Sequence, residues 1–278
     1  MQNCVDGTFK LPKLKMQNDQ ISKAIPWNPW HGCHKCSPGC QNCFVFNMDK
    51  RYGRDTSVIT KGKTTYELKE KNCPAGSLVK LCFSSDFFLE EADEWRGGIW
   101  ETINRRRDCI FVLTTKRPER IIKCLPRNWG DGWEHVHISV SIENQEMADK
   151  RLPYFLDAPL KHREVFCSPL IAPITLGKYL DTGLIKCVNV GGEMAPKQVV
   201  RPIQWEWVKN LYLEAKARGI EFYFHQCGSM FLRDGINIGT WNLNKQIACA
   251  EKIQHELKKC SSLRNRSRIF HRELNEIL

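Results

Sequence analysis

The densest group of cysteines in the chain constrains its fold and chemistry more than any other feature. Four cysteines lie within eleven residues, at Cys33, Cys36, Cys40 and Cys43. Pro38 and Gly39 between them predict a tight turn, because proline fixes φ and glycine adopts the left-handed conformation that sharp reversals often need. A turn that brings several sulfurs together is typical of a metal site.

The spacing of these cysteines indicates three ligands rather than four. Read from Cys36, it is C-x3-C-x2-C. Three thiolates on a cluster of four irons leave one iron without a protein ligand. An open coordination position is typical of catalytic metal sites, whereas structural sites are closed.

Composition sets the class of protein. The 278 residues are 42% hydrophobic, which is a globular value, and no apolar run is long enough to cross a bilayer. The first residues lack the apolar stretch of a secretory signal, so we expect a cytoplasmic protein without membrane contact. In that reducing compartment the fourteen cysteines are expected to be thiols or metal ligands. The net charge of +11 suggests a polyanionic partner, nucleic acid or a phosphorylated substrate, although a simply basic enzyme fits as well.

Short β-branched or aromatic runs alternate with longer helical patterns. This alternation predicts an α/β fold with a mainly parallel sheet, either a partial or a complete TIM-like (β/α) barrel, with a doubly wound open sheet as the competitor. Helices are predicted over residues 93–107 and 203–218, where apolar positions recur about one turn apart. The strands are predicted near residues 25–27 and at 79–83, 109–113, 135–140, 163–167, 185–190 and 220–224.

Polar or glycine clusters follow nearly every predicted strand. In parallel α/β folds the functional site gathers at the carboxyl ends of the strands, so the repetition indicates a site there. Each cluster taken alone is typical of an ordinary loop. The clusters are Ser84-Ser85-Asp86, Thr114-Thr115-Lys116-Arg117, Ser141-Ile142-Glu143-Asn144, Ser168-Pro169, Gly191-Gly192-Glu193 and His225-Gln226-Cys227-Gly228.

Three regions are predicted along the chain: a polar lead-in at 1–24, the barrel at 25–244, and a basic amphipathic helix with a tail at 245–278. The last region could bind nucleic acid or pack on the outside of the barrel, and packing is favoured because a run of charges is usually a solvated face.

Taken in order, these motifs resemble the radical SAM superfamily. More narrowly, the chain is similar to a phage-associated family of uncharacterised radical-SAM-like proteins, over about residues 25–230. The matching motifs are Trp27-Asn28-Pro29, Gly32-Cys33, residues 37–43, residues 84–86, residues 113–117, Glu143-Asn144, Gly191-Gly192-Glu193, and Gln226 with Gly228.

The resemblance implies a particular set of ligands. The family spaces its cysteines as C-x6-C-x2-C, which corresponds to Cys33, Cys40 and Cys43. This chain adds Cys36, which creates the spacing of the wider superfamily, so two triplets share Cys40 and Cys43. The first triplet is preferred, with Cys36 as the alternative first ligand. A second departure is Ser168, which stands where the family tends to have an acidic residue.

The resemblance also implies the chemistry and the cofactors. A [4Fe-4S] cluster would reductively cleave S-adenosylmethionine to a 5′-deoxyadenosyl radical, which abstracts a hydrogen atom from a substrate. The electron would come from a donor such as flavodoxin or ferredoxin. A nucleic-acid base or nucleotide is one candidate substrate, and a small molecule or a peptide stays open.

Roles for the polar clusters follow by charge matching to S-adenosylmethionine. The ammonium group of the ligand needs a hydrogen-bond acceptor, its carboxylate needs a cation or a hydrogen-bond donor, and its ribose hydroxyls need a carboxylate or an amide. Alternatively, Asp86 and Glu143 could cap helices, and residues 116–118 could form a solvated loop. The proposed contacts are Ser85 or Asp86 for the ammonium, Lys116 or Arg117 for the carboxylate, Glu143 or Asn144 for the ribose, Gly191 and Gly192 for close backbone approach, and Glu193 as a further acceptor.

A rival reading is a non-catalytic module that binds nucleic acid through zinc or an iron–sulfur cluster. Cys33 and Cys36 would then pair with Cys40 and Cys43 as four ligands. The short separation of the two pairs argues against zinc, since structural zinc pairs usually lie a dozen or more residues apart. His31 and His34 flank the cysteines and are expected to be loop histidines rather than ligands.

Overall fold

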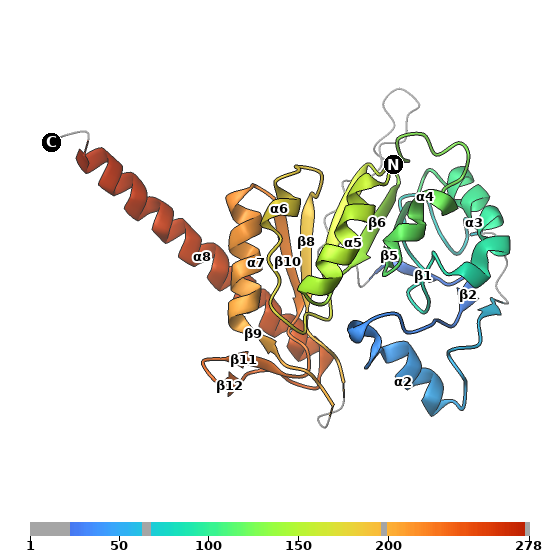
Figure 1. Cartoon of the computed structure of the whole chain (residues 1–278), viewed down its shortest axis with the longest axis horizontal. Coiled ribbons are helices and arrows are strands. Elements are labelled where there is room, and N and C mark those ends of the chain that lie inside the picture. The colour runs from blue at the N-terminus through green and yellow to red at the C-terminus, as the bar shows by residue number, and fades with distance from the viewer. Residues whose placement is uncertain (1–22, 63–67, 196–198, 276–278) are drawn as a thin grey trace.

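The protein is built on a single parallel sheet of seven strands curled into a half-barrel (Figure 1). The structure, a computed structural model, describes residues 23–62, 68–195 and 199–275, with side chains through residue 259. Most of the predicted lead-in at 1–24 lies outside the described residues. The predicted α/β fold with a partial TIM-like barrel is confirmed.

The strands are hydrogen-bonded in the order β1-β4-β5-β6-β7-β8-β10, which is the order of the chain, and every pairing is parallel. Consecutive parallel neighbours place all the carboxyl ends at one edge, where loops can meet. The strands are β1 (Ile25–Trp27), β4 (Leu78–Leu81), β5 (Ile110–Thr115), β6 (Val136–Ser141), β7 (His162–Cys167), β8 (Cys187–Gly191) and β10 (Glu221–Gln226).

Four strand boundaries differ from prediction by two residues: the ends of β4, β5 and β10 and the start of β8. Two of these differences have identifiable reasons. The run 79–83 ends as a strand at Leu81, because Cys82 takes a φ of +56° that no strand continues. The run 109–113 extends to Thr115, since Thr114 and Thr115 pair with Ser139 and Val140. Threonine is β-branched and favours strands, a preference that the predicted boundary did not take into account.

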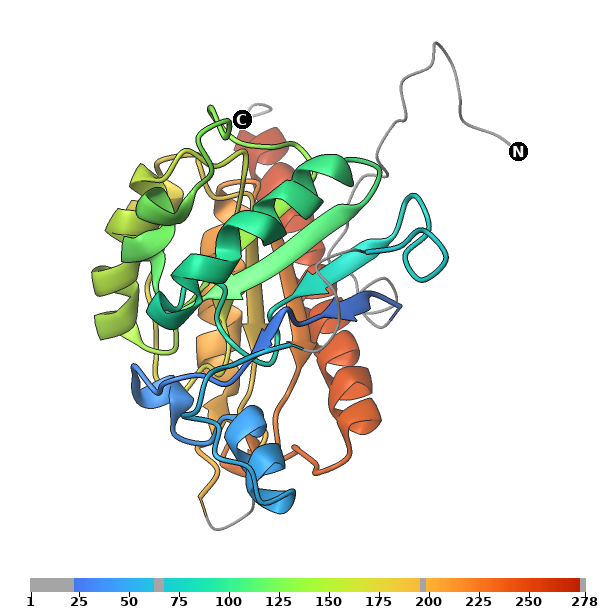
Figure 2. The ribbon, with the colours of Figure 1, turned by 90° about the vertical axis from the view of Figure 1, so that its right-hand side faces the viewer.

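Helices connect the strands and cover one face of the sheet (Figures 1 and 2). The helix predicted over 203–218 begins later, since Ile203–Gln204 forms β9 and pairs with β11 (Phe231–Arg233). The helices are α2 (Phe44–Arg51), α3 (Asp93–Arg105), α4 (Ile121–Cys124), α5 (Gln145–Asp157), α6 (Gly177–Leu180) and α7 (Trp205–Ala217), with 3₁₀ turns at Pro38–Cys40, Glu90–Ala92 and Pro118–Arg120.

The core lies between the sheet and these helices. Alternate strand residues such as Val79, Phe111, Ile138 and Val188 are fully buried against it, as period-two alternation requires. The other face of the sheet carries only a small apolar cluster around Ile110 and Val112. Leu78, Phe166 and Tyr223 pack against this cluster, and polar residues such as Ser139, Glu164 and Asn189 lie on the same face, so the two faces differ in chemistry.

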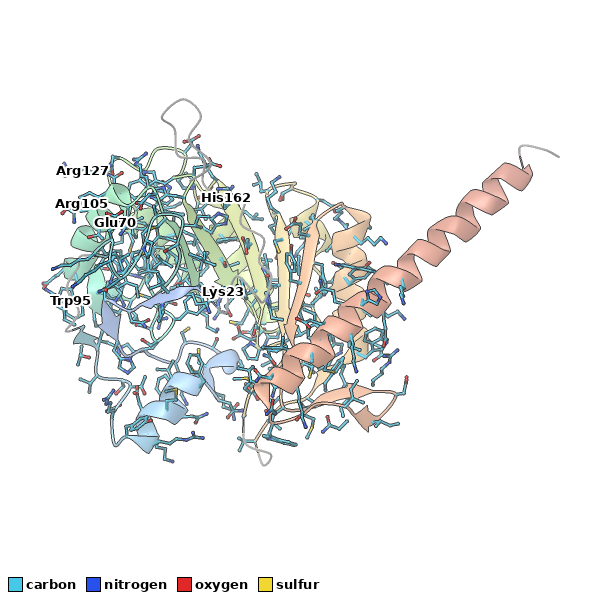
Figure 3. All side chains as sticks on the ribbon, turned by 180° about the vertical axis from the view of Figure 1, so that it is seen from behind. Lys23, Glu70, Trp95, Arg105, Arg127 and His162 are labelled. Atoms are coloured by element: carbon cyan, nitrogen blue, oxygen red, sulfur yellow. The ribbon has the colours of Figure 1, made fainter. Side chains whose placement is uncertain are left out.

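The long helix α8 (Leu243–Asn275) leaves the body of the molecule at its C-terminal end (Figures 1 and 3). Its first part packs along β10 through Ala250, Ile253 and Leu257. Gln254 Oε1 also accepts a hydrogen bond of 2.7 Å from the backbone of Phe224, so the helix satisfies part of the open edge of the sheet. The predicted packing role is confirmed for this part of the helix.

Two small sheets complete the described chain. β2 (Trp30–His31) pairs antiparallel with β3 (Thr60–Lys61), and β11 lies between β9 and β12 (Ile236–Asn237). Each cysteine whose side chain the structure describes is a free thiol. Within the described ranges no helix combines the length and apolarity that crossing a bilayer requires.

Candidate metal centre

The four-cysteine loop, residues 33–43, connects β2 to α2 below the carboxyl ends of the strands (Figure 1). It starts from Gly32, whose φ is +102° and where a Cβ would lie 2.7 Å from the Val58 carbonyl oxygen. Cys33 then donates its backbone N–H to Thr56 at 2.8 Å. Pro38 begins a 3₁₀ turn, and Cys43 precedes the first residue of α2. The predicted turn is therefore present in the middle of the loop, while the contact with Thr56 and the start of α2 fix its two ends.

Glu143, at the end of β6, anchors the middle of the cysteine loop. Its Oε1 accepts the backbone N–H of Gly39 at 2.9 Å, and its Oε2 accepts from Arg151 at 2.7 Å. A Cβ on Gly39 would lie 2.8 Å from the Glu143 carboxyl carbon, so any side chain there would displace this carboxylate. Burial favours a raised pKa for Glu143, but Arg151 and Lys116 outweigh it and hold that pKa below its usual range. A buried carboxylate therefore holds the loop in place.

Arg117 anchors the start of the same loop. Its guanidinium donates to the carbonyl of His34 at 2.9 Å and to Asp86 at 3.0 Å, and it lies 3.9 Å from the sulfur of Cys33. Asp86 is buried and also accepts hydrogen bonds from Thr115 and from the backbone of Lys116. The loops that follow β4 and β5 thus hold a cation against the first cysteine.

The thiols lie in different surroundings. Cys40 is buried, Cys36 is exposed, and Cys33 and Cys43 are partly buried. Burial raises the pKa of Cys33 to about 11, although Arg117 opposes the shift. A hydrogen bond from Cys36 lowers the pKa of Cys40, and Lys116 lowers it further. Arg151 lies 3.9 Å from the Cys36 sulfur. Three cations therefore lie near the sulfurs; they help to lower the pKa of Cys40, whereas burial outweighs them at Cys33.

A cavity of about 250 Å³ opens between this loop and the strand ends. Lys116 lines it and donates to Ser141 at 2.7 Å. Opposite, Gly192 must be glycine, because a Cβ there would lie 2.6 Å from the Cys227 carbonyl oxygen. The other polar residues at its wall are Asn42, Ser168, Glu193 and Gln226, together with Cys40 and Cys43.

A family model described as "Protein of unknown function (DUF5131)" matches residues 21–272. The chain belongs to the DUF5131 family. No curated protein and no solved structure matches this DUF5131 chain.

The cavity gathers some of the predicted cofactor contacts but not all of them. Lys116, Gly192 and Glu193 line it. Gly191 lies next to it, where a Cβ would approach Ser168 Oγ to 2.7 Å. Whether any of these residues binds a cofactor stays a prediction.

The remaining predicted contacts make structural interactions in this DUF5131 chain. Ser85 Oγ donates to the Gly32 carbonyl at 2.5 Å, while Asp86, Arg117 and Glu143 anchor the loop as described. Asn144 is the N-cap of α5 and accepts from the backbone of Met147 at 2.9 Å. The capping alternative was therefore wrong for Glu143, and its neighbour takes that role.

Two arginines of the site were missed by the sequence analysis. Arg151 lies on α5 and pairs with Glu143, which precedes the N-cap of that helix, so the pair lacks the i,i+3 or i,i+4 spacing that marks helical neighbours. Arg201 pairs with Glu193, whose other oxygen accepts from Asn42 at 2.9 Å. Burial opposes ionisation of Glu193, but Arg201 and Asn42 keep its pKa below the usual range. No local pattern marks Arg201, because only the fold brings it to the loop.

Each of the two histidines beside the cysteine loop contacts a carboxylate. His31 lies 2.8 Å from Asp49, and His34 lies 2.5 Å from Glu91. His34 lies in the loop, as expected, whereas His31 belongs to strand β2 and pairs with Thr60, so the loop prediction was wrong for His31. Across the described ranges, no three side chains of histidine, cysteine, aspartate or glutamate are arranged to hold a single metal ion.

Proposed function

We propose that this chain is a radical S-adenosylmethionine enzyme that binds a [4Fe-4S] cluster through its cysteine loop. The observation that carries the proposal is the position of that loop. Four thiols lie at the carboxyl edge of a parallel half-barrel, beside a cavity lined by polar residues of neighbouring strand ends. Catalytic sites of (β/α) barrels lie at this edge.

The donor set fits an anionic iron–sulfur cluster. Soft thiolates are the ligands that iron–sulfur clusters use, and Lys116, Arg117 and Arg151 provide compensating positive charge. Cys40 and Cys43, which belong to both candidate triplets, line the cavity. Either Cys33 or Cys36 would complete the triplet.

When bound, the cluster and S-adenosylmethionine would supply an electron and a radical able to abstract a hydrogen atom. The chain's own residues hold the loop rigid and shape the cavity. Lys116 would place a positive charge near the carboxylate of S-adenosylmethionine. Gln226 fixes the Gly192 backbone by accepting from Gly228 and donating to the Gly192 carbonyl, so the strand end keeps its shape. Glu193 is held by Arg201 at the opposite wall.

An external one-electron donor such as flavodoxin or ferredoxin completes the proposal. The free thiols of the described cysteines suit a reducing, cytoplasmic compartment.

Anaerobic reconstitution tests the proposal. The purified chain is incubated with iron and sulfide, then with dithionite and S-adenosylmethionine, and 5′-deoxyadenosine is quantified. We expect a brown protein that forms 5′-deoxyadenosine only when both reductant and S-adenosylmethionine are present. A colourless protein with stoichiometric zinc, or a brown protein that never forms 5′-deoxyadenosine, would overturn it.

A further inference from the structure

A second, larger hollow lies on the surface beside the cysteine loop. It encloses about 690 Å³ between α2, the segment after Glu193 and the start of α8. Figure 3 shows α2 and the start of α8 along the same lower edge of the molecule. We call this hollow the α2–α8 groove. Its wall is built from parts of the chain that lie two hundred residues apart in sequence, which is why no local motif marks it.

The α2–α8 groove is lined by large apolar side chains that the fold leaves exposed. Phe44 is 49% exposed and Trp241 is 51% exposed. Met48, Met194 and Leu243 stand beside them with similar exposure. Contiguous exposed apolar surface of this kind marks interaction sites in proteins.

Trp241 is held in place although its ring is half exposed. Its indole N–H donates to the carbonyl of Ala195 at 3.3 Å. One edge of the ring is therefore tied to the wall of the α2–α8 groove, and ring surface is left for a ligand. A fixed, exposed aromatic ring is suited to stacking against a flat partner.

The charge of the α2–α8 groove points to an anionic partner. Lys50 and Arg51, at the end of α2, belong to its wall and are exposed. The described residues that line it include no aspartate or glutamate. The chain as a whole carries a net charge of +11. A ligand that combines flat rings with negative charge matches this surface.

The α2–α8 groove is continuous with the cavity at the cysteine loop. Phe44 and Met194 belong to the walls of both. Phe44 directly follows Cys43, and Met194 directly follows Glu193. A chain lying in the groove would therefore extend to the strand ends, and its terminal or flipped-out unit would be next to Cys40 and Cys43.

We propose that the α2–α8 groove binds a single-stranded nucleic acid, with bases stacked on Trp241 and Phe44 and phosphates held by Lys50 and Arg51. Aromatic rings interleaved with cations are the general means by which proteins hold single strands. Binding of the nucleic acid does not depend on the proposed function. The further role of that nucleic acid as the substrate of a radical reaction does rest on the proposed function.

The test is fluorescence anisotropy with labelled single-stranded DNA and RNA of roughly ten nucleotides. Full-length protein is titrated over a range of salt concentrations. We expect binding that weakens with salt, with a logarithmic slope of about −0.7 for each phosphate contacted. The double variant Lys50→Glu, Arg51→Glu should make that slope shallower by roughly 1.4, which corresponds to two phosphates.

The Trp241→Ala variant isolates stacking. We expect affinity to fall about tenfold with the salt slope unchanged, because a stacked base contributes without counterion release. Trp241→Phe should recover most of this loss, since it restores a ring. Thermal unfolding of each variant checks that the fold is intact.

Matched controls come from α5, on the helical side of the sheet. Lys150 and Tyr154 are exposed there and lie outside the α2–α8 groove. Lys150→Glu and Tyr154→Ala should leave affinity and slope within twofold of the parent. Equal effects from the two sets of variants would show nonspecific electrostatic binding and overturn the proposal.

Two further outcomes count against the proposal. The absence of oligonucleotide binding at low salt would overturn it, and so would groove variants that bind oligonucleotides normally but lose binding to an acidic electron-carrier protein. The 5′-deoxyadenosine assay without oligonucleotide separates the two proposals. If the protein cleaves S-adenosylmethionine but does not bind oligonucleotides, only the groove proposal is rejected. If it binds oligonucleotides in the groove but does not cleave S-adenosylmethionine, only the proposed enzyme function is rejected.

Discussion

Two groups of cysteines in this protein lie beside arginine, yet they serve different ends. In the loop of residues 33–43, Arg117 and Arg151 each lie 3.9 Å from a sulfur, and two other thiols of the loop, Cys40 and Cys43, line a cavity. The pair Cys73 and Cys109 has its sulfurs 3.6 Å apart and is fully buried.

The buried pair uses its arginine to tie the chain together. Arg106 lies 3.0 Å from the Cys109 sulfur and also donates to the carbonyls of Leu68 and Cys73 at 2.7 and 2.6 Å. All of these atoms belong to the protein, so nothing is left to bind a ligand. The difference teaches that a cation beside cysteine is not itself a sign of a metal site, and that access to the sulfurs decides.

The largest expected effect separates the two groups outright. Cys40→Ala removes a ligand common to both candidate triplets, so the reconstituted protein should lose its iron and its visible absorbance. Cys109→Ala should keep both, because its sulfur is enclosed by protein. Iron and sulfide analysis after anaerobic reconstitution checks this. Full iron content in the Cys40 variant would break the comparison.

The next effect lies within the loop. Cys33→Ala should abolish cluster assembly, whereas Cys36→Ala should retain it, because Cys33, Cys40 and Cys43 are the preferred ligands. The measurement is iron content with 5′-deoxyadenosine formation as a second readout. If both variants lose the cluster, four protein ligands hold it and the open-site hypothesis fails. If only Cys36→Ala loses it, the alternative triplet is correct.

A third effect concerns what holds the loop. Arg151→Met leaves the buried Glu143 carboxylate without its ion pair, and breaking a buried pair in this way typically costs about 3–5 kcal/mol of unfolding free energy. Urea unfolding of the metal-free protein measures it. Lys150→Met, an exposed neighbour on the same helix, should change stability by less than about 0.5 kcal/mol. A loss in the Arg151 variant no greater than in this control would show that the pair does not support the fold.

The smallest effect belongs to the buried pair. Cys109→Ala removes a sulfur that lies 3.0 Å from Arg106 Nη2, but that nitrogen keeps the Cys73 carbonyl and Asp108 as acceptors. We therefore expect the unfolding free energy to fall by only about 1 kcal/mol. Cys109→Ser should lose less, because its hydroxyl can accept the same hydrogen bond. Urea unfolding at neutral pH compares them. Equal losses in the two variants would mean that packing, rather than the hydrogen bond, stabilises this region.

Much of the architecture follows from local patterns. The seven strands were identified to within a few residues, since β-branched runs and helical periodicity are properties of neighbouring positions. The boundary errors at Leu81 and Thr115 arose where a single backbone conformation or a pair of threonines decided the end. The turn at Pro38 and Gly39 was equally local and was found.

The site was predicted less completely. Strand-end clusters correctly indicated the edge where Lys116, Gly192 and Glu193 come together. Whether a polar residue there faces the cavity or anchors a loop depends on its partners. Asp86 and Arg117 are engaged with each other, and Glu143 with Arg151. Those partners come from separate strands and helices.

The amino-acid sequence by itself determined the order of strands and helices, the tight turn and the concentration of thiols within it, because each depends on residues close along the chain. Only the tertiary structure decided that Arg151 and Arg201 join the loop, that Cys73 and Cys109 are sealed from solvent, and that Trp241 stands opposite α2. These features require segments far apart in sequence to meet, and side-chain packing and ion pairing between them set their geometry.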